Sequence, residues 1–167
     1  MQKAHELGLE EIDAFQSWTQ RFESLQKLVY PHLNQNEQNW TTHLFTKYLH
    51  LIKNNPVENK VIHSDIMPEH IIVNPESQQL AGIIDFADTE ISDPAYDFTY
   101  LRKYGNVFLE EAYRSYRLHR DPHFEERRQF YEDRLVVTNL EHSIKVGDSF
   151  WIGKHLQEFK KYLKQNS

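Results

Sequence analysis

The residues best suited to chemistry lie in two short acidic loops near the middle of the 167-residue chain. The first, residues 63–70, reads HSDIMPEH, and the second, residues 83–88, reads IIDFAD. Asp65, His70 and Asp85 are the notable side chains. Two carboxylates and an imidazole suit a base that accepts a hydroxyl proton next to a divalent metal site.

The elements around these loops predict how the three side chains meet. Short apolar runs predict strands at 61–62, 71–73 and 80–84, and the polar residues 74–79 predict the turn of a small hairpin. A hairpin brings the loops that flank its strands to one end. We therefore expect Asp65, His70 and Asp85 to lie within a few ångströms of one another.

Helices are predicted on both sides of this hairpin. Apolar residues at helical spacing predict helices over 9–30 and 37–53, ended by proline or an Asn-Asn-Pro stop. Asp93 and Pro94 resemble a helix cap followed by proline at the first helical position. The later helices are expected from there to about Lys103, over 107–119, over 123–146, and from Asp148 or Ser149 onward. The fold class is α+β and mostly helical.

The net charge of −6 is concentrated in the segment that carries the loops. Residues 61–100 hold eight Asp and Glu and no Lys or Arg, although the whole chain has 25 acidic and 19 basic residues. Carboxylates set among Ile, Val and Phe require partners when they are desolvated. Two alternatives remain open: a divalent metal or cationic ligand, and pairing with Lys and Arg from the flanking segments.

Composition excludes several classes of protein. The chain has no cysteine, which excludes disulfides, a thiolate nucleophile and cysteine-based metal sites. The acidic balance argues against nucleic acid as a partner. No apolar run is long enough to span a membrane, and the N-terminus has no apolar signal region, so a cytoplasmic location is expected.

The order of these motifs resembles the aminoglycoside phosphotransferase family of kinase-like enzymes. HSDIMPEHIIV, then the aspartate of IIDF, then SDPAYDF follow the pattern H-x-D-x-x-x-x-N/H, hairpin, I-D-F/W and D-P-x-x-D. The likeness is greatest to the 2″-aminoglycoside phosphotransferases. It implies that residues 1–167 form one kinase-like C-terminal lobe, with 61–100 as the catalytic and metal-binding segment.

The resemblance implies a role for each loop residue. Asp65 matches the catalytic aspartate that orients the attacking hydroxyl and accepts its proton. His63 matches the histidine that holds the catalytic loop in shape. His70 and Asp85 match the ligands of Mg²⁺, although His70 could instead be a core histidine, because hard cations prefer oxygen ligands.

Two further acids and one substitution complete the catalytic segment. Asp97 matches the acid that braces the catalytic-loop backbone, and Asp93 is expected to act as a structural helix cap. Ala87 stands where a glycine is usual in the D-F-G motif. Because alanine restricts positive φ, the second loop is expected to be less mobile than in regulated protein kinases.

The resemblance also implies an acidic pocket for a small cationic substrate that bears a hydroxyl group. The candidate substrate-binding residues are Glu69, Asp88, Glu90, Glu141, Asp148 and Trp151. For Glu141 and Asp148 the alternative is a solvated helix end, and for Trp151 it is a place in the core. The resemblance does not separate an aminoglycoside from other amine-bearing alcohols.

The nucleotide-binding part of such a kinase is not found in the sequence. The five glycines, at 8, 82, 105, 147 and 153, are not clustered into a phosphate-covering loop. We expect an antibiotic-resistance kinase lobe that uses ATP or GTP with Mg²⁺ and is inactive without an N-terminal lobe. The alternative is a non-catalytic ligand-binding or remnant module. The face that would meet the missing lobe predicts self-association.

Overall fold

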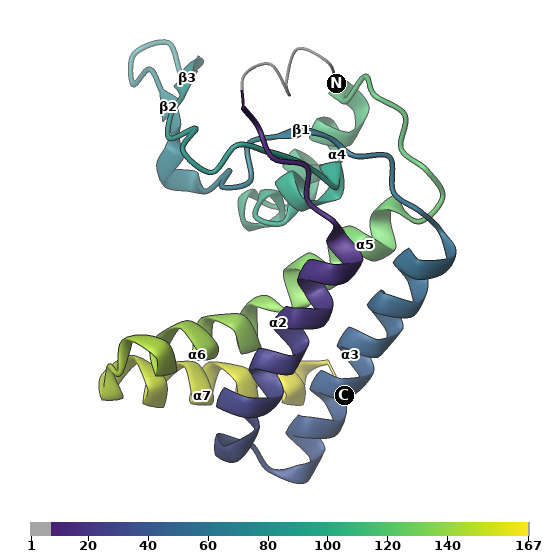
Figure 1. Cartoon of the computed structure of the whole chain (residues 1–167). Helices are drawn as coiled ribbons and strands as arrows, with labels where there is room; N and C mark the ends of the chain where they lie inside the picture. Colours follow the sequence, from purple (N-terminus) through teal and green to yellow (C-terminus); the bar gives the residue numbers. More distant parts are fainter. Residues whose placement is uncertain (1–7, 167) are drawn as a thin grey trace. The chain divides into compact units, whose positions relative to one another are not determined.

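The computed structural model describes residues 8–166, which fall into two compact units (Figure 1). The site unit comprises residues up to 13 together with 57–129, and the helical unit comprises 14–56 together with residues from 130 onward. The boundary between them therefore lies inside helix α5 (Phe124–Asp133). None of the described helices is both long and apolar enough to cross a bilayer.

The helical unit contains four complete α-helices. They are α2 (Ala14–Leu28), α3 (Gln35–Asn54), α6 (Leu135–Val146) and α7 (Ser149–Gln165), with a short 3₁₀ helix, η1 (Tyr30–His32), after α2. Caps lie at the start of α3 and α7 and at the end of α6. Asn34 and Glu37 form a reciprocal capping box at the start of α3. Gly147 ends α6 with φ +78°, a left-handed conformation that favours glycine.

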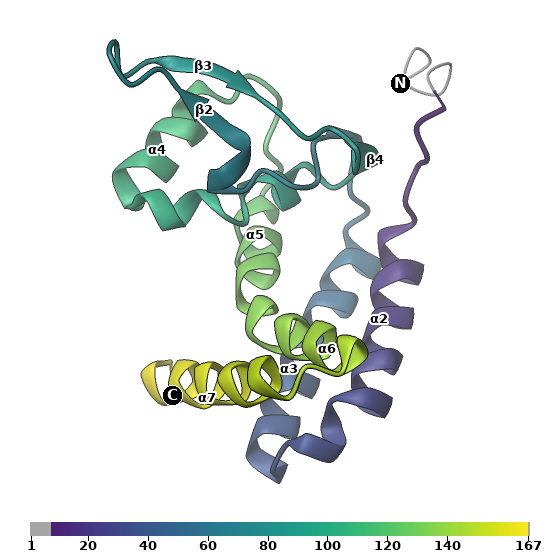
Figure 2. The same ribbon diagram turned by 90° about the vertical axis from the view of Figure 1, so that its left-hand side faces the viewer.

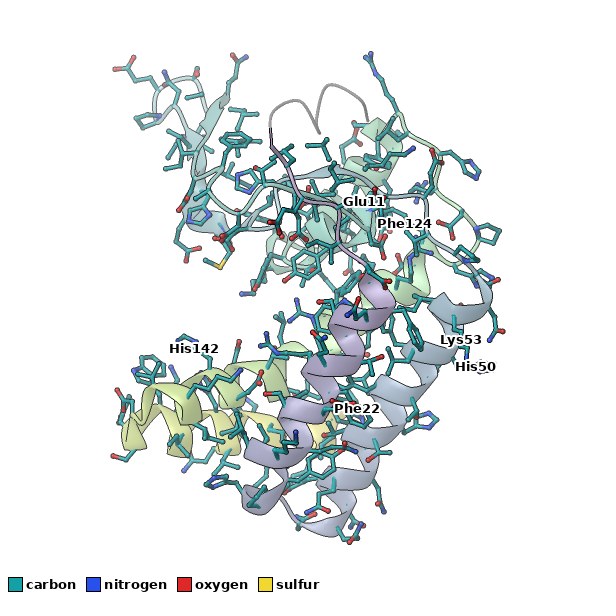
Figure 3. The ribbon with its side chains drawn as sticks, viewed as in Figure 1. Glu11, Phe22, His50, Lys53, Phe124 and His142 are labelled. Atoms are coloured by element: carbon teal, nitrogen blue, oxygen red, sulfur yellow. The ribbon has the colours of Figure 1, made fainter. Side chains whose placement is uncertain are left out.

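Aromatic side chains form the core of this unit. Phe22 of α2, labelled in Figure 3, stacks on Phe45 of α3 with ring centroids 5.1 Å apart. Tyr48 stacks on Phe130 at 3.6 Å, and Trp18 packs edge-on against both of these rings. Large buried rings of this kind contribute most of the apolar area that leaves water when such helices pack.

The site unit contains two small antiparallel sheets (Figure 2). β1 (Lys60–Ile62) pairs with β4 (Glu90–Ser92), and β2 (Ile71–Val73) forms a hairpin with β3 (Leu80–Ile83). Around them lie the 3₁₀ helices η2 (Pro68–His70), η3 (Pro94–Phe98) and η4 (Leu101–Tyr104), and α4 (Asn106–Ser115). The two catalytic-loop candidates therefore connect one sheet to the other, and the predicted α+β, mostly helical class is confirmed.

Several predicted boundaries differ from the observed ones for local reasons. Residues 9–12 are extended rather than helical, because their backbone pairs with Ile91 of β4: Ile12 N–H donates to Ile91 O, and Ile91 N–H donates to Glu10 O. The predicted helix 123–146 is interrupted at Arg134, between α5 and α6. The helix expected from Asp93 to about Lys103 is two 3₁₀ turns, η3 and η4.

Candidate active site

His63 links the two loops at the centre of the site unit. It follows β1 and is buried. Its Nε2 donates to the carbonyl of Ile84 at 3.0 Å, and its Nδ1 accepts the backbone N–H of Asp65 at 3.3 Å. A carbonyl on one nitrogen and an N–H on the other assign the neutral Nε2–H tautomer. The position of Asp65 is therefore coupled to the second loop through one imidazole.

Asp97 holds the backbone of the same loop from η3. Its Oδ2 accepts the N–H of His63 and its Oδ1 accepts the N–H of Ser64, each at 2.9 Å. Ser64 has φ +70°, a conformation that costs energy for a residue other than glycine and needs support from its surroundings. Burial raises the pKa of Asp97, and the two N–H donors oppose that rise.

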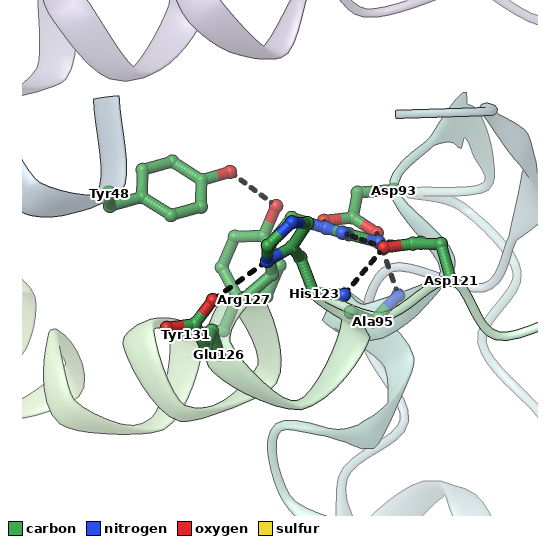
Figure 4. Close-up of polar contacts among 8 residues, drawn as sticks. All are labelled: Tyr48, Asp93, Ala95, Asp121, His123, Glu126, Arg127 and Tyr131. Atoms are coloured by element: carbon green, nitrogen blue, oxygen red, sulfur yellow. Dashed lines mark hydrogen bonds and ion pairs between the residues drawn. The ribbon is translucent and has the colours of Figure 1, made fainter. Parts of the chain in front are cut away.

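A buried ion pair lies at the start of η3, the short helix that carries Asp97 (Figure 4). Asp93 caps the helix by accepting the N–H of Ala95 at 3.0 Å. Arg127 of α5 donates from Nε to Asp93 at 2.7 Å, and its two terminal nitrogens each donate to Asp121 at 2.8 Å. Asp93 and Arg127 are 0% and 1% exposed, so this charge-assisted pair lies out of water.

The two loops bring three potential metal ligands together. One ligand atom each from Asp65, His70 and Asp85 lies within 4.8 Å of the other two. His70 Nδ1 is 2.7 Å from the carbonyl oxygen of Asp65 and 3.3 Å from its carboxylate, and Nε2 is 3.6 Å from the carboxylate of Asp85. Among the described residues this is the only such group of three acidic or imidazole side chains.

The surroundings of His70 raise the pKa of its imidazole. The hydrogen bond to the carbonyl of Asp65 is the main cause that raises the pKa of His70, and the charges of Asp65 and Asp85 add to it. Nδ1 of the ring has the carbonyl of Asp65 as its partner, and Nε2 faces the carboxylate of Asp85.

Backbone geometry explains why alanine is accepted in the second loop. Asp85 has φ +65°, and Ala87 is not among the described residues with positive φ. The left-handed turn therefore falls two residues before the alanine. Ile84 of the second loop is bonded to both ends of the first loop, since its N–H donates to His70 O at 3.0 Å and its carbonyl accepts from His63.

The donor set fits a divalent cation. Around a cation with ~2.1 Å bonds, adjacent octahedral ligands lie about 3.0 Å apart and opposite ones about 4.2 Å apart. The 3.6 Å between His70 and Asp85 falls between these values. Two carboxylates also supply the negative charge that such an ion requires.

An acidic hollow of about 630 Å³ opens beside Asp65. It is lined by Gly8, Leu9, Glu10, Ile12, Ser64, Asp65, Ala87, Asp88, Thr89, Glu90 and Tyr96. Four of these residues are acids and none is Lys or Arg. Burial raises the pKa of Glu90, which Ser92 and Ser64 partly offset by hydrogen bonding. The hollow therefore suits a small cationic molecule.

Glu10 is a lining residue that the sequence reasoning missed. Its apolar neighbours Leu9 and Ile12 have helical spacing, so the segment was predicted as part of the first helix. The extended pairing with Ile91 instead brings Glu10 to the hollow. An alternative reading of LGLEEI as a short strand was the only available signal, and it depends on a partner 80 residues away.

The predicted substrate residues are divided between the two units. Asp88 and Glu90 line the hollow, whereas Glu69, which is also in the site unit, does not. Asp148 and Trp151 belong to the helical unit, where Asp148 caps α7 through the N–H groups of Phe150 and Trp151.

Glu141 also lies in the helical unit, and its side chain is fully buried. Its carboxylate forms ion pairs with Arg21 and Lys145 and accepts a hydrogen bond from Ser24 at 2.6 Å. These partners lower the pKa of Glu141 against the opposing effect of burial. This arrangement favours a structural role for Glu141 over the predicted contact with substrate.

Comparison with solved structures places this arrangement in the class of kinase-like phosphotransferases. The chain is similar to the GDP and kanamycin complex of APH(2″)-IIIa, with 26% identity and a TM-score of 0.86 over 99% of this chain and 57% of the other. The chain is also similar to the GDP complex of wild-type aminoglycoside 2′-phosphotransferase-IIIa, with 25% identity and a TM-score of 0.82. That comparison covers 99% of this chain and 56% of the other. A type I macrolide 2′-phosphotransferase shares the fold, with 16% identity and a TM-score of 0.73 over 93% of this chain and 52% of the other.

The chain belongs to the phosphotransferase enzyme family, the APH family, whose sequence model matches residues 3–130. The predicted family resemblance is thereby confirmed. No curated protein matches the chain significantly. The chain spans a little over half the length of these aminoglycoside phosphotransferase structures.

Proposed function

We propose that this chain is the catalytic lobe of a small-molecule kinase that phosphorylates a hydroxyl group of an amine-bearing acceptor. The observation that carries the proposal is the position of Asp65, which lies in the acidic hollow and beside His70 and Asp85. An acceptor bound through its amines in the hollow would present a hydroxyl group to this carboxylate.

The proposed reaction assigns a role to each of these residues. The acceptor oxygen forms a bond to the γ-phosphorus of ATP or GTP, the bond from that phosphorus to the bridging oxygen breaks, and the nucleoside diphosphate leaves. Asp65 accepts the hydroxyl proton. His63 and Asp97 orient Asp65 through the loop backbone. A divalent cation held by Asp85 and His70 supplies positive charge to the nucleotide phosphates when it is bound.

An aminoglycoside is the substrate class that the comparisons favour. Two similar structures are described as aminoglycoside phosphotransferases, one of them a complex with kanamycin. We expect the chain by itself to transfer phosphate slowly, because it spans about 57% of the length of such an enzyme.

The test is transfer of labelled phosphate from GTP and from ATP to kanamycin. Asp65→Asn keeps the shape of the side chain but removes its basicity, and should lower the rate by roughly 10²–10⁴-fold. Glu76→Gln, in the exposed hairpin turn, is the matched control and should leave the rate unchanged. Equal rates for the wild-type protein and Asp65→Asn would refute the assignment.

The partial coverage of the similar structures favours a second candidate, a non-catalytic module that binds an aminoglycoside. Calorimetry with kanamycin separates the two. Binding of kanamycin with no detectable transfer from either nucleotide would favour the module, whereas transfer that is lost in Asp65→Asn would favour the kinase.

A further inference from the structure

The helical unit has a groove of its own, of about 670 Å³, between the start of α3 and the end of α7. A volume of this size accommodates a small organic molecule. None of the residues to which the proposed reaction gives a role lies in this unit, so that reaction does not account for the groove. The residues that line this α3–α7 groove are Asn34, Asn36, Glu37, Trp40, Lys160, Leu163 and Lys164.

Two lysines give the groove an excess of positive charge. Lys160 and Lys164 lie four residues apart on α7, so their side chains are neighbours on one face of the helix. Both are exposed, and neither has an ion-pair partner among residues 8–166. Lys145 of the same unit, by contrast, pairs with Glu141 at 2.7 Å. Like charges at this spacing repel each other, and one dianion between the two ammonium groups would remove the repulsion.

The one carboxylate in the lining already accepts a hydrogen bond. Glu37 is buried, and its carboxylate accepts the backbone N–H of Asn34 at 2.8 Å in the capping box of α3. In return, the side-chain oxygen of Asn34 accepts the N–H of Glu37 at 3.0 Å, which leaves the NH₂ of that amide to donate. Asn36 adds a second amide to the lining. The groove therefore offers ammonium and amide donors to an anion.

An aromatic side chain supplies the apolar part of the groove. The ring centroid of Trp40 lies 5.5 Å from that of Phe159 and 5.8 Å from that of Tyr162, so two rings of α7 fix its position. The indole N–H of Trp40 has no hydrogen-bond partner in the part of the chain that the structure describes. Leu163 also lines the groove. A planar ring packs well against a surface of this kind.

We propose that the α3–α7 groove binds a small aromatic phosphate monoester. The phosphate, which carries nearly two negative charges at neutral pH, bridges Lys160 and Lys164. The ring of the ligand packs against Trp40 and Leu163. A cationic amine, which suits the acidic hollow of the site unit, would be repelled here by the two lysines. The site goes beyond the proposed kinase reaction and does not depend on it.

Titration of the full chain with phenyl phosphate, followed by ¹H–¹⁵N NMR spectroscopy, tests the proposal. No divalent cation is added, so the acidic site unit should repel the probe. Phenyl phosphate should bind about tenfold more tightly than inorganic phosphate, because only the former brings a ring to Trp40. It should bind about two- to fivefold more tightly than benzoate, which carries a single charge.

A measurement on the unaltered chain guards against a variant that fails to fold. The indole N–H resonance of Trp40, identified by its absence from the Trp40→Phe variant, should shift on addition of phenyl phosphate. The indole resonances of Trp18 and Trp151, which do not line the groove, should stay in place.

Neighbouring lysines of α7 provide matched variants. Lys160→Gln and Lys164→Gln should each weaken the binding of phenyl phosphate about two- to fivefold. Lys161→Gln makes the same change of net charge at an exposed residue outside the lining, and should leave the affinity unaltered.

The proposal is overturned if Lys160→Gln and Lys161→Gln weaken binding equally, because the attraction would then be one of net charge. A Trp40 resonance that stays in place at saturating phenyl phosphate would overturn it as well. Benzoate bound as tightly as phenyl phosphate would exclude a phosphate as the ligand. Asp65→Asn should bind phenyl phosphate as the wild-type chain does, so failure of this site and failure of the proposed kinase are seen separately.

Discussion

Single residues of the site unit each make several contacts at once. His63 accepts from the backbone of Asp65 and donates to Ile84, so the candidate base and the second loop share one ring. The carbonyl of Asp65 orients His70, and Asp65 also lines the hollow. A change at one of these residues should therefore affect both loops.

Glu10 is the residue whose role is most open to a direct test. Glu10 lines a hollow that has no Lys or Arg among its lining residues, so its carboxylate should attract an amine of the acceptor. Glu10→Gln should raise KM for kanamycin about three- to tenfold and leave kcat within twofold, since one partly exposed charge pair contributes roughly 1 kcal/mol. Initial rates measured at low and high salt will check this.

Glu11→Gln provides the control for that measurement. Glu11 is the next residue on the same extended segment, but it accepts from Asn59 and does not line the hollow. If the two variants raise KM equally, the effect is one of net charge and Glu10 has no particular place in acceptor binding.

Among the elements, η3 shows how a short helix can position a loop. It is a five-residue 3₁₀ helix, with little stability of its own. Asp93 at its start is held by Arg127, and Asp97 within it holds the backbone of His63 and Ser64. The sequence motif identified the two aspartates but not the arginine, which lies 34 residues beyond Asp93.

Replacing Arg127 should therefore lower the stability of the site unit. Arg127→Met leaves the carboxylate of Asp93 buried without its cation, which typically costs about 3–5 kcal/mol. Thermal and urea unfolding will measure the loss. Arg114→Met is the control, because Arg114 is exposed on α4 and pairs only with the exposed Glu111 among the contacts described. Similar losses for both variants would contradict the role given to the buried pair.

The sequence predicts the β2–β3 hairpin well and β4 poorly. The β2–β3 hairpin follows from two apolar runs beside a turn, which are local features. β4 reads only EIS, and it forms because β1 and residues 10–12 supply partners on either side. Pairing of that kind depends on distant backbone and leaves no local pattern.

At the scale of the whole molecule, the concentration of negative charge in residues 61–100 has two explanations at once. Asp93 pairs with Arg127 from the flanking segment, as the second alternative required. Asp65 and Asp85 surround a candidate cation site, and Asp88 and Glu90 line the hollow, as the first required. The charge count could not separate the two because it contains no distances.

The stability of the fold should depend on pH through Asp121, the partly exposed acid that pairs with Arg127. Hydrogen bonds from Arg127 lower the pKa of Asp121 from 3.8 to about 2. A depressed pKa in the folded state stabilises the protein above the unfolded pKa, and this contribution is lost as the pH falls from about 4 to 2.

Asp121→Asn isolates that contribution. Because Asp121 is partly exposed, the variant should be less stable at pH 7 by about 1 kcal/mol or less, and the difference should disappear near pH 2. Melting temperatures measured from pH 2 to pH 7 will show it. A constant difference across this range would mean that Asp121 stabilises the fold by other means than its charge.

The sequence by itself determined the family, the mostly helical class, the hairpin and the loop residues around Asp65, because these depend on residue types and spacings within about forty residues. Only the tertiary structure decided that Glu10 reaches the hollow, that Arg127 holds η3, and that Glu141 is paired with Arg21 and Ser24. Each of these results from contacts between distant segments, where a partner's position decides whether a charge is buried, paired or available to a ligand.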